Sequence, residues 1–150
     1  MSSRRRPDQS IGITQFSNIP PDLQKIWALE YIASWQPFAG YGLKSVLDAV
    51  NVQLATKCYA IALENHTILG YIGWVLTTKD SVELWRGGSG QLRAISEKPD
   101  AAVITILAVS SPKLILPLVR FAFRQADSLP IFWKRDIAGK GLIARQINRS

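Results

Sequence analysis

The sequence predicts an α/β (α+β) fold with a mostly antiparallel central sheet and helices packed on it. Three observations predict this fold: two helical stretches come early, extended apolar runs follow them, and a third helical stretch follows the most apolar run. Apolar residues make up 47% of the 150 residues and charged residues 19%, a balance typical of a single domain that buries a core.

The two early helices are expected over residues 23–35 and 43–54. The segment Asn18-Ile19-Pro20-Pro21-Asp22 begins the first helix, because proline fits an opening helical turn. The apolar residues of this helix cover more than one face, so we expect it to be buried on two sides or to lie at an interface. Buried packing is expected of its Trp27, as it is of Trp74.

The middle and end of the chain predict the sheet. Residues 57–63 and 68–77 are extended apolar runs, and the polar turn between them predicts a hairpin. Shorter strands are expected at 82–85 and 91–96, on either side of a glycine-rich loop. Residues 102–109 predict the central strand, since they are apolar on both faces. A helix is expected at 114–126, and strands at 131–134 and 142–147.

Residues 1–18 are polar and lack periodicity, so they predict a flexible basic arm ahead of a single domain at 19–150. No apolar run approaches the roughly 20 residues of a membrane span, and no signal peptide is recognised after Arg4-Arg5-Arg6. We therefore expect a cytoplasmic protein or a component of a larger assembly. The single cysteine, Cys58, excludes a disulfide within the chain and a cysteine-based metal cluster, and its apolar neighbours predict a core residue.

The net charge of +7 is concentrated toward the two ends of the chain. Such ends attract anionic partners with an affinity that falls as salt rises. A solvated rim, an acidic protein partner and a nucleic acid are the three readings that the charge leaves open. Tryptophan beside basic residues also suits a protein interface or base stacking, although core or rim packing is the favoured explanation of Trp85 and Trp133. The candidate partner-binding residues are Arg4, Arg5, Arg6, Trp133, Lys134 and Arg135.

Several short segments appear in a fixed order along the chain. They are Ile32-Ala33-Ser34-Trp35-Gln36-Pro37, Tyr59-Ala60-Ile61-Ala62-Leu63, Leu69-Gly70-Tyr71-Ile72-Gly73-Trp74, Leu84-Trp85 with Gly88-Ser89-Gly90, and the strand and turn at 104–112. Together with the closing helix and strand at 121–135, they resemble the RTX toxin-activating lysine acyltransferases, which have a variant of the GNAT acetyltransferase fold. The resemblance covers about two thirds of the chain and implies a GNAT-like fold.

The resemblance also implies a chemistry, the transfer of a fatty acyl group from acyl carrier protein to a lysine of a target protein. The family uses a histidine after the first helix and an aspartate on the core strand. Here these positions fall on Phe38 and Thr105, neither of which takes up a proton at neutral pH. His66, in the hairpin turn, and Asp100, before the core strand, are the candidate substitutes, although each also reads as an ordinary turn residue.

Three functions follow as hypotheses. The first is a divergent, non-catalytic acyltransferase-like domain that serves as a protein-binding or assembly module, for example in a bacterial or phage assembly. The second is the lysine acyltransferase itself, which would use an acyl carrier protein thioester and no other cofactor. The third is a nucleic-acid-associated basic protein. The glycine-rich loop at 86–90 does not lead into a predicted helix, so it reads as a hairpin loop and not as a coenzyme A site.

Overall fold

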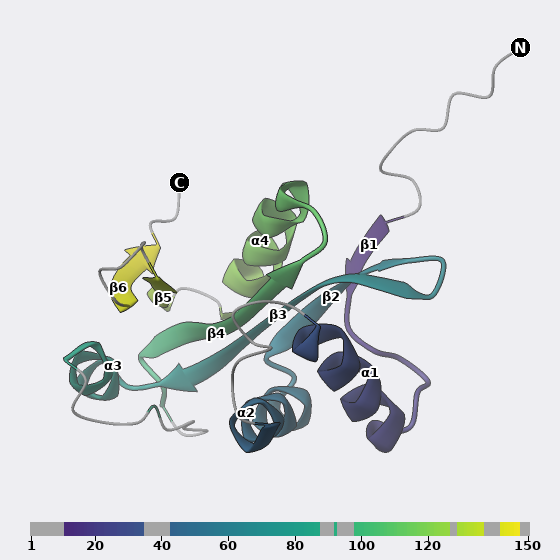
Figure 1. Ribbon diagram of the computed structural model, residues 1–150. Helices are drawn as coiled ribbons and strands as arrows, with labels where there is room; N and C mark the ends of the chain where they lie inside the picture. Colours follow the sequence, from purple (N-terminus) through teal and green to yellow (C-terminus); the bar gives the residue numbers. More distant parts are fainter. Residues whose placement is uncertain are drawn as a thin grey trace, which may run out of the picture.

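The computed structural model describes residues 11–34, 43–87, 92, 98–126, 129–136 and 142–147. Within these residues the chain forms a six-stranded sheet in the order β1-β2-β3-β4-β5-β6 (Figure 1). The strands are β1 (Ile11–Thr14), β2 (Tyr59–Glu64), β3 (Thr67–Thr77), β4 (Ala101–Val109), β5 (Ile131–Asp136) and β6 (Leu142–Ile147). Neighbouring strands run antiparallel except for β4 and β5, which are parallel. The mostly antiparallel sheet is thus confirmed.

Helices cover both faces of this sheet. α1 (Pro21–Ala33) and α2 (Leu43–Thr56) lie on one face, and α4 (Ile115–Ala126), entered through a 3₁₀ turn at Pro112–Leu114, lies on the other (Figure 1). α3 (Lys79–Arg86) follows the end of β3. The core accordingly has one cluster beneath α4, one beneath α1 and α2, and a smaller third cluster around Val82 of α3. This is the three-layer solution for a sheet that must bury both of its faces.

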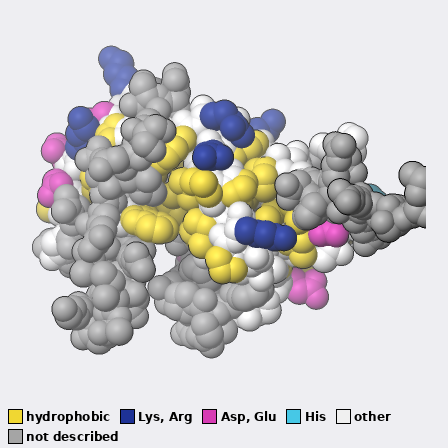
Figure 2. Space-filling model, turned by 90° about the horizontal axis from the view of Figure 1, so that it is seen from above, with side chains coloured by type: hydrophobic (Ala, Val, Ile, Leu, Met, Phe, Trp, Pro, Cys, Tyr) yellow, Lys and Arg dark blue, Asp and Glu magenta, His cyan; other side chains and the backbone are white. Residues whose placement is uncertain are grey.

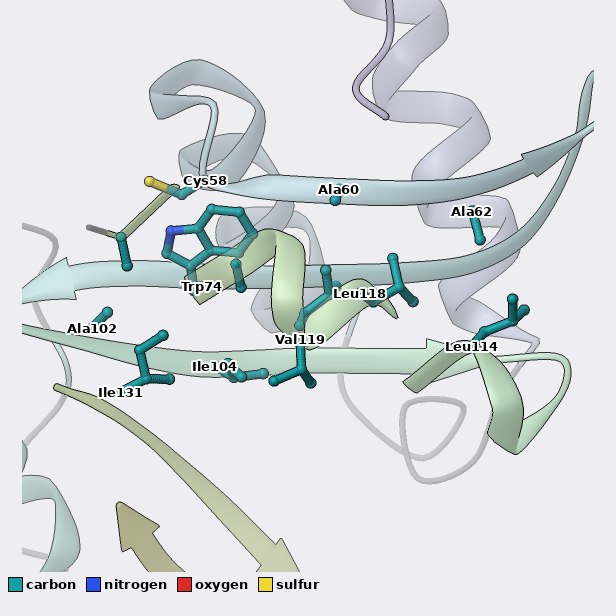
Figure 3. Packing of buried hydrophobic residues seen from close by; sticks show 13 residues of the cluster. Cys58, Ala60, Ala62, Trp74, Ala102, Ile104, Leu114, Leu118, Val119 and Ile131 are labelled. Atoms are coloured by element: carbon teal, nitrogen blue, oxygen red, sulfur yellow. The ribbon is translucent and has the colours of Figure 1, made fainter. Parts of the chain in front are cut away.

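The cluster beneath α4 is drawn in Figure 3. Trp74 is buried there at 2% exposure, as the sequence predicts, and Cys58 belongs to the same cluster. Small side chains on the strands, Ala60, Ala62 and Ala102, leave room for Leu118 and Val119 of α4 and for the indole of Trp74 (Figure 3). Matching large side chains to small ones across the two layers allows the interior to reach close packing.

The hairpin between β2 and β3 is confirmed. Asn65 has a φ of 47° and His66 a φ of 69°. Two successive residues with positive φ are typical of a type I′ turn, whose twist matches that of the strands on either side. His66 therefore serves as the second central residue of a tight turn.

The strand predicted at 82–85 is wrong, because this segment belongs to the helix α3. Two hydrogen bonds cap the start of the helix. The Thr78 hydroxyl accepts a hydrogen bond from the Ser81 N–H at 3.1 Å, and the Asp100 carboxylate accepts one from the Lys79 N–H at 2.6 Å. The second acceptor lies 21 residues further along the chain, so helix capping here depends partly on tertiary structure.

The expected arm at 1–18 differs from the structure over its second half. Ile11–Thr14 forms the edge strand β1, which pairs antiparallel with β2 and turns Ile11 and Ile13 toward the sheet's core. Alternation of apolar and polar residues over four positions is enough for a strand when a longer strand lies beside it. Residues 1–10 lie outside the described part of the chain.

α1 is buried on one face, not on two. Ala28 and Ile32 are fully buried, whereas Leu23, Ile26 and Trp27 are 41%, 54% and 41% exposed. The buried packing predicted for Trp27 is therefore wrong. The apolar residues that cover the second face of the helix are presented on the surface, which leaves the interface reading of this helix open. Among the described residues, no helix is long and apolar enough to cross a membrane.

Candidate functional site

The central strand β4 loses its β5 neighbour halfway along. Ala102, Val103 and Ile104 pair with Ile131, Phe132 and Trp133, and beyond these pairs β5 is paired with β6 alone in the described register. Thr105 is the first residue of β4 past the paired segment. We call the divergence of β4 and β5 at this residue the fork.

Thr105 is also the extra residue of a β-bulge. Gly73 of β3 pairs with Ile106, and the next residue, Trp74, pairs with Ile104, so Thr105 has no partner on β3. The bulge breaks the alternation of side chains along β4: Ile104 packs in the cluster beneath α4, whereas Ile106 packs beneath α1 and α2. As a result Thr105 is directed toward α2, where it meets Gln53.

Three side chains form a hydrogen-bonded network at the fork. The Tyr71 hydroxyl donates to Oε1 of Gln53 at 2.8 Å, and Nε2 of Gln53 donates to the Thr105 hydroxyl at 2.7 Å. Gln53 and Tyr71 are fully buried, and Thr105 is partly buried. Gly73 makes the arrangement possible, because a Cβ atom at that position would collide with the Gln53 amide. All three groups are uncharged, and each has a hydrogen-bond partner within the network, as buried polar groups require.

Among the described residues, three titratable groups in or beside this network are held in their neutral forms. Burial, reinforced by the neighbouring Tyr59 and Cys58, raises the pKa of Tyr71 far above its ordinary value. Burial also raises the pKa of Tyr59, against the opposing effect of the hydrogen bond from the Phe16 N–H. Burial raises the pKa of Cys58 as well, and its buried position in the core is confirmed. None of these groups is poised to accept a proton at neutral pH.

The two candidate substitutes for the catalytic residues lie at opposite ends of the sheet. Asp100 caps α3 through the Lys79 N–H and is five residues from Thr105, roughly 17 Å along an extended strand. His66 is seven residues from Gly73, the partner of the bulge, which is roughly 24 Å along β3. The structure does not bring either of them to the fork. Phe38, the other family position, lies outside the described residues.

The candidate partner-binding residues are only partly described. Trp133 packs against the cluster beneath α4, and Trp85 packs against a third cluster around Val82, so packing explains both rings. The backbone of Lys134 and Arg135 belongs to β5, but their side chains lie outside the described part, as do Arg4, Arg5 and Arg6.

In the described turns, several backbone N–H groups that could meet a pyrophosphate are absent or already bonded. Gly87 follows the C-terminus of α3, and its N–H donates to the Glu83 carbonyl. The C-terminal end of a helix carries a partial negative charge, which repels anions. The 3₁₀ turn before α4 contains Pro112 and the first turn of α4 contains Pro117, and neither residue has an N–H. The N–H groups of Ser110 and Leu114 in that turn are already bonded to backbone carbonyls. Residues 88–91 lie outside the described part.

No protein-family model matches the sequence, and no curated protein matches it. Among solved structures, the chain is similar to a GNAT family acetyltransferase from Brucella melitensis, crystallised in complex with acetyl-CoA. The TM-score is 0.54 at 17% identity, over 93% of this chain and 89% of that one. It is also similar to a GNAT family acetyltransferase from Streptococcus agalactiae, with a TM-score of 0.49 at 10% identity over 85% and 77% of the two chains. The first likeness shows that the fold is GNAT-like, as expected.

Sequence reasoning placed Thr105 at a site position but did not find Gln53 or Tyr71. Two signals for them are present. Gly73 interrupts a strand of large apolar residues, which is typical of a bulge or of a close approach by another group. Gln53 follows Val46 and Val50 at the spacing of a buried helical face, where a lone amide needs a partner.

Proposed function

We propose that this chain is a non-catalytic, acyltransferase-like domain that binds a protein partner, descended from the RTX toxin-activating lysine acyltransferases. The observation that carries the proposal is the neutral network of Gln53, Tyr71 and Thr105 at the fork. Acyl transfer to a lysine needs a group that takes a proton from the ammonium or carries the acyl chain. At the fork, the described side chains instead donate to and accept from one another.

The charge of the described surface supports an acidic protein as the partner. The outer face of α4 and the turn before it present Lys113, Arg120 and Arg124, all exposed, and this helix carries no acidic residue. Leu116 is 55% exposed between them. Figure 2 shows this side of the molecule, where Lys and Arg side chains stand among apolar ones. We call these four residues the α4 basic stripe; a basic surface with one apolar anchor favours an acidic protein surface over a bare polyanion.

The first experiment tests for catalysis. The purified chain is incubated with acyl-loaded acyl carrier protein and candidate lysine peptides, and acylated peptide is measured by mass spectrometry. We expect no transfer above the rate without protein. Clear turnover that is lost in Asp100→Asn or His66→Asn would overturn the non-catalytic proposal and restore the lysine acyltransferase.

The second experiment tests the partner surface. Wild-type chain and the variant Arg120→Glu/Arg124→Glu are used as bait, and Lys79→Glu/Lys98→Glu makes the same change in net charge at exposed positions away from α4. We expect one stoichiometric, acidic protein partner that is lost with the α4 variant, retained with the control and weakened by salt. Equal loss with both variants would contradict a specific stripe. Retention of the wild type on single-stranded DNA at physiological salt would favour the nucleic-acid reading.

A further inference from the structure

A second feature lies away from both the fork and the α4 basic stripe. A pocket of about 640 Å³ opens between α1, the connection from β1 to α1, and the hairpin of β2 and β3. We call it the hairpin pocket. It is lined by Phe16, Ser17, Ile19, Trp27, Glu30, Tyr31, Leu63, His66, Thr67 and Ile68. Its volume is within the range of about 300 to 1,000 Å³ that sites for small ligands occupy.

Hydrogen bonds and ring contacts fix the walls of the hairpin pocket. The Tyr31 hydroxyl lies 2.8 Å from the Leu69 carbonyl and 3.0 Å from the Ser110 hydroxyl, which ties α1 to the ends of β3 and β4. On the opposite wall, the Phe16 N–H donates to the Tyr59 hydroxyl at 2.9 Å, and the two rings are 5.8 Å apart. The pocket is therefore formed before any ligand arrives, which reduces the entropic cost of binding.

The interior of the hairpin pocket is apolar and rich in aromatic rings. Phe16 and Trp27 are 6.3 Å apart with their planes tilted by 59°, and Tyr31 supplies a third ring to the lining. Trp27 remains 41% exposed although it is the largest apolar side chain on the helix. Aromatic rings that line a hollow can attract a cation through their electron-rich faces.

The charge at the pocket has the complementary sign. Of the described residues that line it, Glu30 carries the one formal charge at neutral pH with histidine counted as neutral. The Glu30 carboxylate is exposed and makes no ion pair or hydrogen bond with the described residues. A carboxylate at the edge of an aromatic hollow is thus available, on a protein whose net charge is +7. The net positive charge of the protein repels cations from most of its surface. A local negative charge therefore directs a cation to the hairpin pocket.

From these observations we infer that the hairpin pocket binds a small organic cation with an apolar body, a quaternary ammonium compound being the simplest case. The cationic head would lie against the rings of Phe16 and Trp27, near Glu30, and the apolar body would contact the aliphatic part of the lining. A quaternary ammonium has no N–H to acylate, so the site is a binding site and not the acceptor site of a transfer reaction. The inference does not depend on the proposed function, since the pocket and the fork share no residue.

The experiment compares four probes by NMR chemical-shift titration of the full-length chain. Choline, its neutral carbon isostere dimethylbutanol and the anion dimethylbutyrate share one shape, and benzyltrimethylammonium adds an apolar body to the cation. We expect benzyltrimethylammonium to bind most tightly, choline about five- to tenfold more tightly than dimethylbutanol, and dimethylbutyrate not at all. The shifted signals should include the Trp27 indole N–H.

Two variants assign the selectivity to the pocket. In Glu30→Gln, choline should lose about fivefold in affinity and approach dimethylbutanol, whose binding should not change. Asp22→Asn removes the same charge from an exposed position of α1 outside the pocket, and should leave both affinities as they are. Equal affinity for the cation and its neutral isostere, preference for the anion, or no binding of benzyltrimethylammonium would each overturn the inference. Circular dichroism confirms that the variants are folded.

Discussion

Gln53 of α2 and Thr105 of β4 are joined by a 2.7 Å hydrogen bond although 52 residues separate them in sequence. The bond exists because a bulge turns Thr105 toward α2 and because Gly73, on the strand between, has no side chain to obstruct the amide. A helix, a bulge and a glycine are therefore interdependent at the fork. A disturbance at any of them should be felt at the other two.

Gly73→Ala tests this dependence most directly. The added methyl group would collide with the Gln53 amide, which must move and leave Tyr71 and Thr105 without their partner. Overpacking and unsatisfied buried hydroxyls should together lower the free energy of unfolding by about 2 to 4 kcal/mol, measured by urea denaturation. Gly12→Ala is the control, since a Cβ atom there meets no atom within 4 Å; its effect should stay within about 0.5 kcal/mol. Equal effects of the two substitutions would contradict the account.

Asp100→Ala separates a capping role from a catalytic one. Loss of the carboxylate leaves the exposed Lys79 N–H at the start of α3 without its cap, so stability should fall by about 1 kcal/mol. Asp100→Asn keeps an acceptor oxygen and should lose less. Thr78→Ala removes the other cap of the same helix and should match Asp100→Ala in size. A stability unchanged in Asp100→Ala would show that the carboxylate is free for another purpose.

His66→Gly should stabilise the protein. His66 has a φ of 69°, a conformation in which a side chain costs roughly 1 to 2 kcal/mol and glycine costs nothing. The resulting Asn-Gly pair is the sequence preferred by type I′ turns, so we expect a gain of about 0.5 to 1 kcal/mol in the free energy of unfolding, read from thermal or urea denaturation. His66→Val, which is β-branched, should lose stability. A destabilised His66→Gly would indicate that the imidazole makes a contact worth more than the strain.

Much of the fold could be predicted from apolar patterning. The hairpin, the central strand and the helix after it are long and strongly periodic, and the last strand was predicted with its observed bounds, Leu142–Ile147. Two short elements were not. α3 depends on a cap from the distant Asp100, and β1 has four residues whose stability comes from pairing with β2. Tertiary contacts determine whether such short elements form, and the local sequence pattern carries no information about those contacts.

The candidate site was predicted only through one residue. Thr105 was recognised by family resemblance. Its contact with Gln53 depends on the register shift between Gly73 and Trp74 of β3. Strand register of this kind could not be predicted from the one sequence. Trp27 is a residue for which the sequence pattern predicted burial and the structure shows exposure. An aromatic residue on an apolar helix reads as core, and only the placement of α1 reveals that its second face is on the surface beside the hairpin pocket.

The stability of the protein should fall at alkaline pH, and Tyr71 should account for a large part of the fall. Burial raises the pKa of Tyr71 above its ordinary value of 10.0, and burial raises that of Cys58 above 9.0. Above those ordinary values the unfolded chain releases protons that the folded chain retains, so unfolding is favoured as the pH rises. The stability conferred by the neutral phenol is fully present below pH 10 and is lost as the pH climbs toward the raised value.

Tyr71→Phe, compared with wild type by urea denaturation at several pH values between 7 and 11, isolates this effect. At neutral pH the variant should be less stable by about 1 to 3 kcal/mol, because Oε1 of Gln53 loses its donor. Above pH 10 its denaturation midpoint should fall less steeply than that of wild type, since phenylalanine does not titrate. Cys58→Ala, measured in parallel, removes the contribution of the Cys58 thiol to the alkaline loss of stability, which begins one pH unit below that of Tyr71. Wild-type and Tyr71→Phe curves that stay parallel across the alkaline range would show that the Tyr71 phenol is not the group whose buried neutrality stabilises the fork.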